Sequence, residues 1–270
     1  MSDRYTACSP IAVPAGFASE IHGLSWYRDQ VGESGCEVYR LTDADRRPLR
    51  YLKHGLRPQA DDLIDEYVRL HWLQTRIDVP AIGGFLWADA EAWLLTAAVP
   101  GLTAYQLLEQ GDESIAHAVV DAAADYLRRL HALSIQDCPF NAGHAIRLVR
   151  AQERMEQGLV EEDDFDEARL GQTPEALWKR LSTLAPDGTE LVVTHGDYSL
   201  DNLILPPDGP PRCIDVGRLG VADRYQDVAI AWNSLGEFGA DLQRRFLLRY
   251  GIAKLDARRL EFHLTLDEFF

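Results

Sequence analysis

Short alternating segments of apolar and polar residues dominate the first hundred positions, a pattern that favours β-strands. Two pairs of such segments each flank a polar turn: residues 37–41 with 49–53, and residues 85–87 with 92–95. Each pair predicts a β-hairpin. Between the pairs, residues 61–75 repeat apolar side chains at a nearly helical period. The N-terminal part is therefore expected to be strand-rich with one helix.

After the turn-forming sequence Val99-Pro100-Gly101, the pattern becomes mainly helical. Six segments predict helices: 115–133, 145–157, 173–184, 224–235, 241–250 and 257–266. Three short apolar segments predict strands: 191–194, 203–205 and 212–215. We therefore expect an α+β protein with a small β-rich N-lobe, residues 1–98, and a larger α-rich C-lobe, residues 99–270.

Composition narrows the choice of partners. The chain has 270 residues, of which 46% are hydrophobic and 26% charged, as in ordinary globular proteins. Its formal net charge of -16 argues against nucleic acid and against anionic membranes as partners, because both attract basic surfaces. The charge suits a cationic ligand, although acidity also simply favours solubility.

The cysteines and the N-terminus bear on location. Cys8, Cys36, Cys138 and Cys213 lie far apart and form no CxxC pair, as expected for reduced thiols in the cytosol. The N-terminus shows no apolar signal region, and no apolar run approaches the roughly 20 residues that span a bilayer. We expect a cytoplasmic protein, and nothing in the sequence suggests an obligate oligomer, so a monomer is expected.

The strongest chemical signal is an ordered set of polar residues. Asp197 is followed five residues later by Asn202, and Asp215 comes thirteen residues after that, just before Val216-Gly217. This is the layout of a kinase catalytic loop followed by its metal-binding Asp. Asp197 could orient a substrate hydroxyl and accept its proton, while Asn202 and Asp215 offer the oxygen ligands that Mg²⁺ prefers. Asp and Asn also favour turns, but turn propensity does not explain the ordered set. Together with the two-lobe pattern, it predicts phosphoryl transfer by a bilobal eukaryotic-protein-kinase-like fold.

A kinase also needs groups that hold the nucleotide. Tyr51 and Lys53 alternate with Leu52 on a predicted strand, so they share one face and could bind adenine and phosphate. Glu66, in the following helix, is the expected ion-pair partner of Lys53. An isolated strand Lys is also typical of an exposed edge, and Glu66 could instead face solvent.

Two further segments complete the predicted nucleotide site. Gly32-Glu33-Ser34-Gly35 could form a loop over the phosphates with Ser34 as a hydroxyl donor, although it could also be a plain turn. Residues 95–99 would form the strand that meets adenine, with Ala97 and Val99 as the contacts through their backbone groups.

Several of these segments together closely resemble the aminoglycoside 3'-phosphotransferases. The resemblance is carried by Val193-Thr194-His195-Gly196-Asp197, by Asp201-Asn202-Leu203-Ile204, by residues 213–227, which begin Cys213-Ile214-Asp215-Val216-Gly217, and by Leu266-Asp267-Glu268-Phe269-Phe270. It extends over nearly the whole chain. The family implies a kinase-like fold that transfers the γ-phosphoryl group of ATP, with Mg²⁺, to the 3'-hydroxyl of antibiotics of the kanamycin and neomycin class.

The resemblance also implies roles for particular residues. Asp197 corresponds to the catalytic Asp, Lys53 and Glu66 to the phosphate-holding pair, Asn202 and Asp215 to the magnesium ligands, and Ser34 to the phosphate-loop Ser. The implied antibiotic-binding residues are Asp164, Glu167, Arg218, Glu237, Asp267, Glu268 and Phe270, the last through its terminal carboxylate. Arg218 could bind substrate or brace its loop. Asn233-Ser234 departs from relatives that place an acidic residue there, which leaves drug specificity open.

The charge of the antibiotic gives the acidic residues a physical purpose. Aminoglycosides carry several ammonium groups, so a cleft lined with carboxylates would steer and orient them. Acidic residues at 163–167 also suit the first turn of a helix or a solvated surface. Carboxylates at 267 and 268 are harder to explain in this way, because at a helix C-terminus they oppose the helix dipole.

Two other functions remain open from the sequence. One is a related small-molecule kinase that phosphorylates another hydroxyl, such as that of choline or of a macrolide sugar. The other is a catalytically inactive kinase fold that only binds a nucleotide or a partner. The paired acidic clusters favour a polyamine over the former, and the presence of Lys53, Asp197, Asn202 and Asp215 argues against the latter.

Overall fold

The computed structural model describes residues 4–30, 35–186 and 188–270, and the chain divides into two compact units. The first unit contains the described residues up to Leu102 together with Ile204–Gly217. The second unit contains Thr103–Leu203, described except at 187, and Arg218–Phe270. Residues 204–217 thus belong with the N-terminal strands, although they lie a hundred positions further along the chain.

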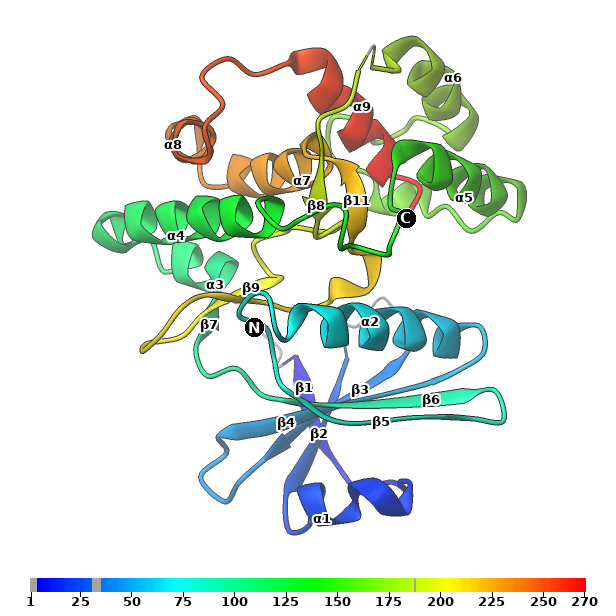
Figure 1. The fold of residues 1–270 in the computed structure, drawn as a ribbon, viewed down its shortest axis with the longest axis vertical. Helices are drawn as coiled ribbons and strands as arrows, with labels where there is room; N and C mark the ends of the chain where they lie inside the picture. The colour runs from blue at the N-terminus through cyan, green and yellow to red at the C-terminus, as the bar shows by residue number, and fades with distance from the viewer. Residues whose placement is uncertain (1–3, 31–34, 187) are drawn as a thin grey trace. The chain divides into compact units, whose positions relative to one another are not determined.

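The first unit is built on an antiparallel sheet of six strands in the order β1-β2-β3-β4-β6-β5 (Figure 1). Its strands are β1 (Tyr5–Cys8), β2 (Ser25–Asp29), β3 (Glu37–Thr42), β4 (Pro48–Leu56), β5 (Ile82–Ala88) and β6 (Glu91–Ala97). The central strand β4 pairs with β3 and β6, so that Lys53 lies opposite Val38 on one side and Leu94 on the other. Both predicted hairpins, β3–β4 and β5–β6, are present.

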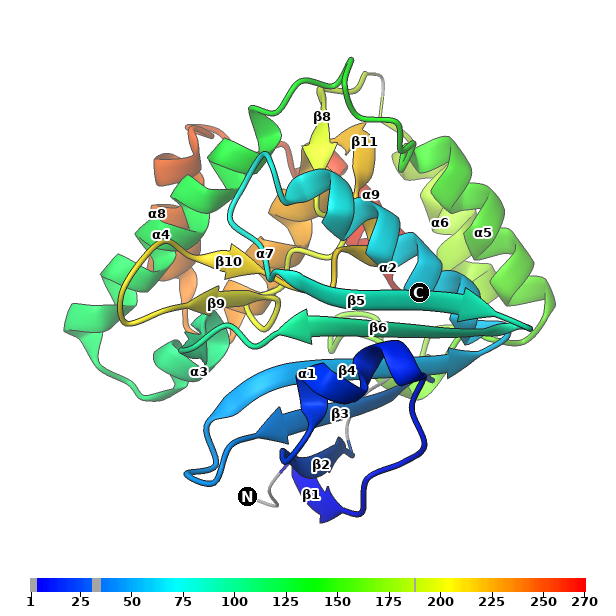
Figure 2. The same cartoon turned by 60° about the horizontal axis from the view of Figure 1, so that its bottom comes forward.

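Helices cover the two faces of this sheet (Figure 2). On one face, a 3-10 turn (Ala15–Phe17) and α1 (Ala18–Ile21) contribute Phe17 and Ile21 to a cluster with Trp26 and Leu52. On the other face, α2 (Gln59–Leu73) buries Ala60 and Leu63 against Ala92. Because side chains alternate along a strand, Tyr51 and Lys53 point away from the Leu52 cluster and towards the α2 face.

The segment 204–217 adds short strands and a sharp change of direction. β9 (Leu203–Leu205), β10 (Arg212–Cys213) and β7 (Leu102–Thr103) form a small sheet in the order β10-β9-β7. The predicted strand 212–215 ends at Cys213, because Asp215 adopts a left-handed backbone with φ of 56°. Few residues other than Gly, Asn and Asp adopt this conformation, so the Asp here has a positional reason.

The second unit is mainly helical (Figure 1). Its helices are α3 (Ala104–Glu109), α4 (Glu113–His131), α5 (His144–Glu156), α6 (Pro174–Leu184), α7 (Tyr225–Gly236), α8 (Ala240–Tyr250) and α9 (Ala257–Asp267). A two-stranded antiparallel sheet joins β8 (Leu191–Thr194) to β11 (Gly220–Asp223), with Thr194 opposite Gly220. A buried cluster that includes Phe165, Leu177 and Phe262 packs α5, α6 and α9 together.

The seven predicted helices, including the one expected at 61–75, are confirmed with ends within two residues, and the structure adds α1, α3, β1, β2, β7 and β11. Among the described residues, no helix combines the length and the apolar character that crossing a bilayer requires.

Candidate active site

Three charged side chains meet in the first unit. The Nζ of Lys53, on β4, donates to the Oε1 and Oε2 of Glu66, on α2, at 2.9 and 2.8 Å. The same Nζ also donates to the Oδ1 of Asp215. Strand, helix and the 204–217 segment each contribute one member, so the cluster depends on the tertiary fold. Of these three side chains, that of Asp215 is the most exposed to solvent.

The electrostatics favour a permanently charged Lys53. Burial alone would lower the pKa of Lys53, but Asp215 and Glu66 outweigh it and raise that pKa above its ordinary value. Gly217 lies directly beyond this cluster, and a Cβ built there would stand 3.7 Å from the Cβ of Glu66. The segment after Asp215 therefore passes close to the helix that carries Glu66.

The remaining predicted nucleotide residues lie around this cluster or outside the described part. Tyr51 is half-buried, its ring centroid is 6.4 Å from that of Tyr5, and burial raises its pKa. Ala97 ends β6, where its N–H donates to the carbonyl of Ala81 at 2.8 Å, and Val99 is buried. Ser34 lies outside the described residues. Contacts of these residues with a nucleotide stay predictions.

The second unit contains the loop that carries Asp197 and Asn202. The loop follows β8, and the Nδ2 of Asn202 donates to the backbone carbonyl of Asp197 at 3.0 Å. Gly196, with φ of 92°, packs so closely against the carbonyl of Arg218 that a Cβ would clash with it. Asp197 is half-buried and Asn202 is buried. The loop conformation thus depends on a glycine that no larger residue can replace without strain.

A buried carboxylate anchors this loop. Asp227, on α7, accepts hydrogen bonds from the backbone N–H of His195 at 2.7 Å and of Gly196 at 2.8 Å. Its Oδ2 also lies 2.9 Å from the Nε2 of His131, whose Nδ1 is 2.7 Å from the hydroxyl of Tyr250. Sequence reasoning missed Asp227 and His131 as supporting residues, although Asp227 ends the segment 213–227 that carries the family resemblance. Their supporting role becomes visible only from the hydrogen bonds that join Asp227 to the loop and to His131.

The predicted magnesium ligands fit the chemistry of a hard cation. Among the described residues, no group of three or more His, Cys, Asp and Glu side chains forms a metal cluster. Asp215 offers a carboxylate, and the amide nitrogen of Asn202 is engaged with Asp197, which leaves the amide oxygen as the atom for a cation. Carboxylate and amide oxygens are suitable for Mg²⁺, which usually takes its other ligands from water and phosphate.

Arginines hold the C-terminal residues 267–270 in the second unit. The Nη2 of Arg147 donates to the Oδ1 of Asp267 at 2.8 Å, and the Nε of Arg154 donates to the carbonyl of Phe269 at 2.6 Å. The guanidinium groups of Arg147 and Arg218 lie 4.6 and 5.6 Å from the centroid of the Phe270 ring. Arg218 therefore contacts another predicted substrate residue, and its backbone also packs against Gly196.

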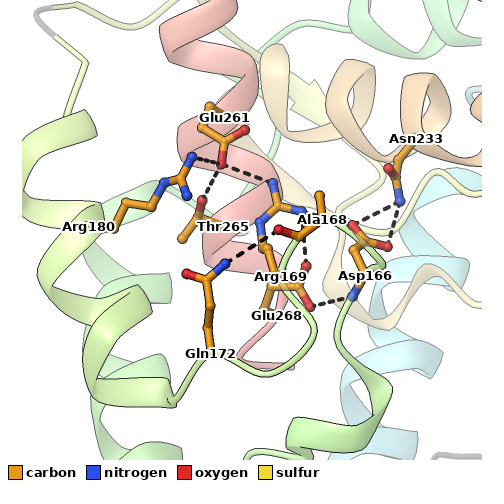
Figure 3. A network of polar contacts seen from close by, with 9 residues as sticks. All are labelled: Asp166, Ala168, Arg169, Gln172, Arg180, Asn233, Glu261, Thr265 and Glu268. Atoms are coloured by element: carbon orange, nitrogen blue, oxygen red, sulfur yellow. Dashed lines mark hydrogen bonds and ion pairs between the residues drawn. The ribbon is translucent and has the colours of Figure 1, made fainter.

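The other predicted antibiotic residues differ in their surroundings. Asp164 ends a 3-10 turn (Glu162–Asp164) and is exposed, as is Glu167. Glu237 accepts a hydrogen bond from the hydroxyl of Tyr105 at 2.8 Å. The side chain of Glu268 is buried, with 6% exposed, and contacts Arg169. Figure 3 shows this carboxylate within a wider polar network.

Comparison with known proteins agrees with this chemistry. A model of the phosphotransferase enzyme family matches residues 31–263. An aminoglycoside 3'-phosphotransferase of Escherichia coli is 48% identical over 267 residues, which cover 99% of this chain and 98% of the relative.

Solved structures extend the comparison to the fold. An aminoglycoside-3'-phosphotransferase of type VIII has a TM-score of 0.83 and 33% sequence identity, covering 93% of this chain and 96% of that one. The aminoglycoside phosphotransferase APH(3'')-Id of Streptomyces rimosus, solved with ADP and streptomycin, has a TM-score of 0.75 and 32% identity, covering 88% and 94%. The predicted α+β, protein-kinase-like fold is thus confirmed.

Proposed function

Because this chain belongs to the phosphotransferase enzyme family and is similar along almost its whole length to an aminoglycoside 3'-phosphotransferase, we propose that it phosphorylates the 3'-hydroxyl of aminoglycoside antibiotics with ATP and so confers resistance. The structural observation that supports this proposal is the joining of Lys53, Glu66 and Asp215 from three segments of the first unit. A Lys–Glu pair beside a metal-binding Asp is the arrangement by which kinases hold a nucleoside triphosphate.

In this proposal, residues of the first unit bind the nucleotide. Lys53, fixed by Glu66, donates to phosphate oxygens, and Tyr51, Ala97 and Val99 contact the adenine. Ser34 contributes from the phosphate loop. Mg²⁺, held by Asp215 and Asn202, would neutralise phosphate charge when it is bound.

The loop that Asp227 anchors binds the hydroxyl that accepts the phosphoryl group. The carboxylate of Asp197 accepts a hydrogen bond from the 3'-hydroxyl and takes up its proton as the oxygen attacks the γ-phosphorus. The bond from that phosphorus to the bridging oxygen breaks, and ADP leaves with the bond's electron pair. Because the transition state of phosphoryl transfer is loose, orientation of the hydroxyl is the main contribution of Asp197.

The antibiotic is bound by carboxylates of the second unit. Asp164 and Glu167 lie exposed on one segment, and Asp267 and Glu268 lie on another, with Glu237 on a third. Phe270 contributes to the same site, and Arg218 contacts the substrate or braces the loop. Several ammonium groups on one ligand suit several carboxylates, and the charge of -16 favours attraction of a polycation.

The same proposal includes the setting of the enzyme. We expect it to act in the cytoplasm as a monomer, without nucleic acid or membrane partners. The four cysteines all lie among the described residues and form no disulfides there, which is compatible with a reducing compartment.

The first experiment compares ADP release with MgATP in the presence of kanamycin and of tobramycin, which lacks the 3'-hydroxyl. Turnover with kanamycin and none with tobramycin supports 3'-phosphorylation. Equal turnover with both would place the phosphoryl group on another hydroxyl and contradict the proposal. Turnover with neither would direct attention to other hydroxyl acceptors.

A further inference from the structure

Arg169 is a buried guanidinium surrounded by carboxylates in the second unit (Figure 3). Only 3% of the residue is exposed. Its Nη1 donates to Asp166 at 3.1 Å and to Glu268 at 3.2 Å, and its Nη2 donates to Glu261 at 3.2 Å. A charge so deeply buried is tolerated only when it is paired and hydrogen-bonded. The three partners come from the segment before Arg169 and from the C-terminal region.

Asp166 ties the same network to a third part of the unit. Its backbone N–H donates to the Oε2 of Glu268 at 3.2 Å. Its carboxylate accepts from the Nδ2 of Asn233, on α7, with both oxygens at 3.0 and 3.1 Å. The segment 164–169 is therefore fixed to α7 through Asp166 and to the C-terminal residues through Arg169 and Glu268.

The tethered residues lie among the predicted antibiotic-binding residues, and Glu268 belongs to both groups. Asp164 and Glu167 flank the tethered Asp166, and both are exposed. Asp267 and Phe270 flank Glu268 and Phe269 at the C-terminal end. The distance between the two acidic segments thus depends on the contacts that Arg169 and Asp166 make with Glu268.

We propose that Arg169 is a positioning residue for the antibiotic site, which holds the segment 164–167 and the residues 267–270 at the spacing that a polyamine ligand requires. This inference rests on the proposed function. Arg169 itself touches no substrate, and it acts through Asp166 and Glu268. Its removal should therefore affect binding of the antibiotic and leave the nucleotide side unchanged.

The positioning role of Arg169 can also be followed through the protonation of Glu268. Glu268 is faced by Asp166 and Arg169 from the loop, while Glu261, also bound by Arg169, is shared with Arg180 of α6. Burial and the neighbouring Asp166 raise the pKa of Glu268 to about 7, whereas Arg169 lowers it. Without Arg169 the carboxyl should hold its proton to a still higher pH.

The test is steady-state kinetics with kanamycin and ATP on Arg169→Gln and Arg169→Lys. We expect the KM for kanamycin to rise about tenfold or more in Arg169→Gln, because a displacement near 1 Å of a positioning group is costly. The KM for ATP should stay unchanged. Arg169→Lys should show a smaller rise, since one ammonium group replaces two donating nitrogens. A purely structural role would instead lower the melting temperature and leave both KM values unaltered.

Arg180→Gln is the matched control. Arg180 binds the same Glu261 at 2.9 Å, but its side chain is 44% exposed, and within the described part of the chain it makes no hydrogen bond or ion pair with Asp166 or Glu268. This variant should keep the wild-type KM for kanamycin. An equal rise in Arg180→Gln, or a wild-type KM in folded Arg169→Gln, would overturn the proposal. If Arg169→Gln does not fold, a wild-type KM in Arg169→Lys overturns it.

The pH dependence separates this proposal from the proposed function. As pH falls, the KM for kanamycin should begin to rise at a higher pH in Arg169→Gln than in the wild type. The amines of kanamycin titrate equally in both measurements, so they do not produce the difference. Superimposable profiles would contradict the role of Arg169, whereas an inactive wild-type enzyme would contradict the proposed function instead.

Discussion

Both carboxylate oxygens of Glu66 accept hydrogen bonds from the Nζ of Lys53, at 2.9 and 2.8 Å. Glu66 is buried in the helix that covers the sheet, so it cannot follow a moving lysine. The pair therefore fixes the position of the ammonium group on β4 before any nucleotide arrives. Its contribution to phosphate binding can be measured by removing one charge.

Glu66→Gln should weaken the use of ATP. The loss of a hydrogen bond between charged groups costs about 1.5–3 kcal/mol, which corresponds to a roughly 10- to 150-fold lower kcat/KM for ATP. Asp61→Asn, in the same helix, removes an exposed carboxylate that pairs with Arg57 and should have little effect. An unaltered kcat/KM for ATP in Glu66→Gln would show that the ion pair does not serve the nucleotide.

Asp197→Asn should abolish most turnover while nucleotide binding survives. An Asn can still accept a hydrogen bond but cannot take up the proton of the hydroxyl, a loss worth about 10²–10⁴-fold in rate. Kinetics with kanamycin and calorimetric titration with ADP would measure the two properties separately. Asp201→Asn changes a carboxylate in the same loop and should remain active. Near-normal turnover of Asp197→Asn would mean that another group handles the acceptor.

Local sequence patterns predicted most of the elements, and the exceptions have physical causes. The hairpins and the long helices carry strong periodicity. β1 and β2 are short, mixed in polarity and defined by pairing with each other, as in Tyr5 opposite Asp29. α3 has only six residues, but its capping box of Thr103 and Gln106 was a signal in the sequence. Such short elements depend on partners that a local window does not contain.

The residues of the candidate site were likewise only partly predictable from the sequence. The order of Asp197, Asn202 and Asp215 pointed to phosphoryl transfer, because motif spacing is a local property. The support given by Asp227 to the catalytic loop, 31 and 32 residues away in sequence, could not be read from spacing. Nor could the contacts of Arg169 with Glu261 and Glu268, since a buried arginine looks like any surface arginine in a sequence.

Tyr105→Phe should weaken binding of the antibiotic through Glu237. The hydroxyl of Tyr105 donates to that carboxylate at 2.8 Å, and this hydrogen bond raises the pKa of Tyr105. The phenylalanine keeps the ring against Phe238, so only the hydrogen bond is lost. The KM for kanamycin should rise roughly tenfold. Tyr67→Phe, whose ring stacks on Phe85, is the matched control and should show no change.

Asp227→Asn should destabilise the protein and slow catalysis together. The carboxylate accepts two backbone N–H donors and contacts His131, and an amide can satisfy only part of this set. We expect a loss of about 3 kcal/mol in the free energy of unfolding, measured in urea, and a lower kcat.

Asp223→Asn provides the control for Asp227→Asn. Asp223 is equally buried and binds Arg259 at 2.6 and 2.8 Å. Its variant should lose stability and yet retain kcat at temperatures where it is folded. If both variants retain kcat, Asp227 supports the fold without positioning the catalytic loop.

The free energy of unfolding should decrease between pH 4.5 and pH 7 through Glu268. Burial beside Asp166 raises the pKa of this carboxyl from 4.5 to about 7, so the folded chain binds the proton more tightly than the unfolded chain. This contribution is fully present below pH 4.5 and is lost as pH rises through 7, amounting to at most about 3 kcal/mol.

Urea unfolding of the wild type and of Glu268→Gln over this pH range measures the contribution. Because Gln carries no titrating proton, the difference in unfolding free energy between the two proteins should change with pH and level off above about 7. Glu167→Gln removes an exposed carboxylate from the neighbouring segment and should run parallel to the wild type. A pH-independent difference for Glu268→Gln would mean that Arg169 keeps Glu268 ionised throughout, and the acid-dependent rise in the KM for kanamycin would then need another titrating group.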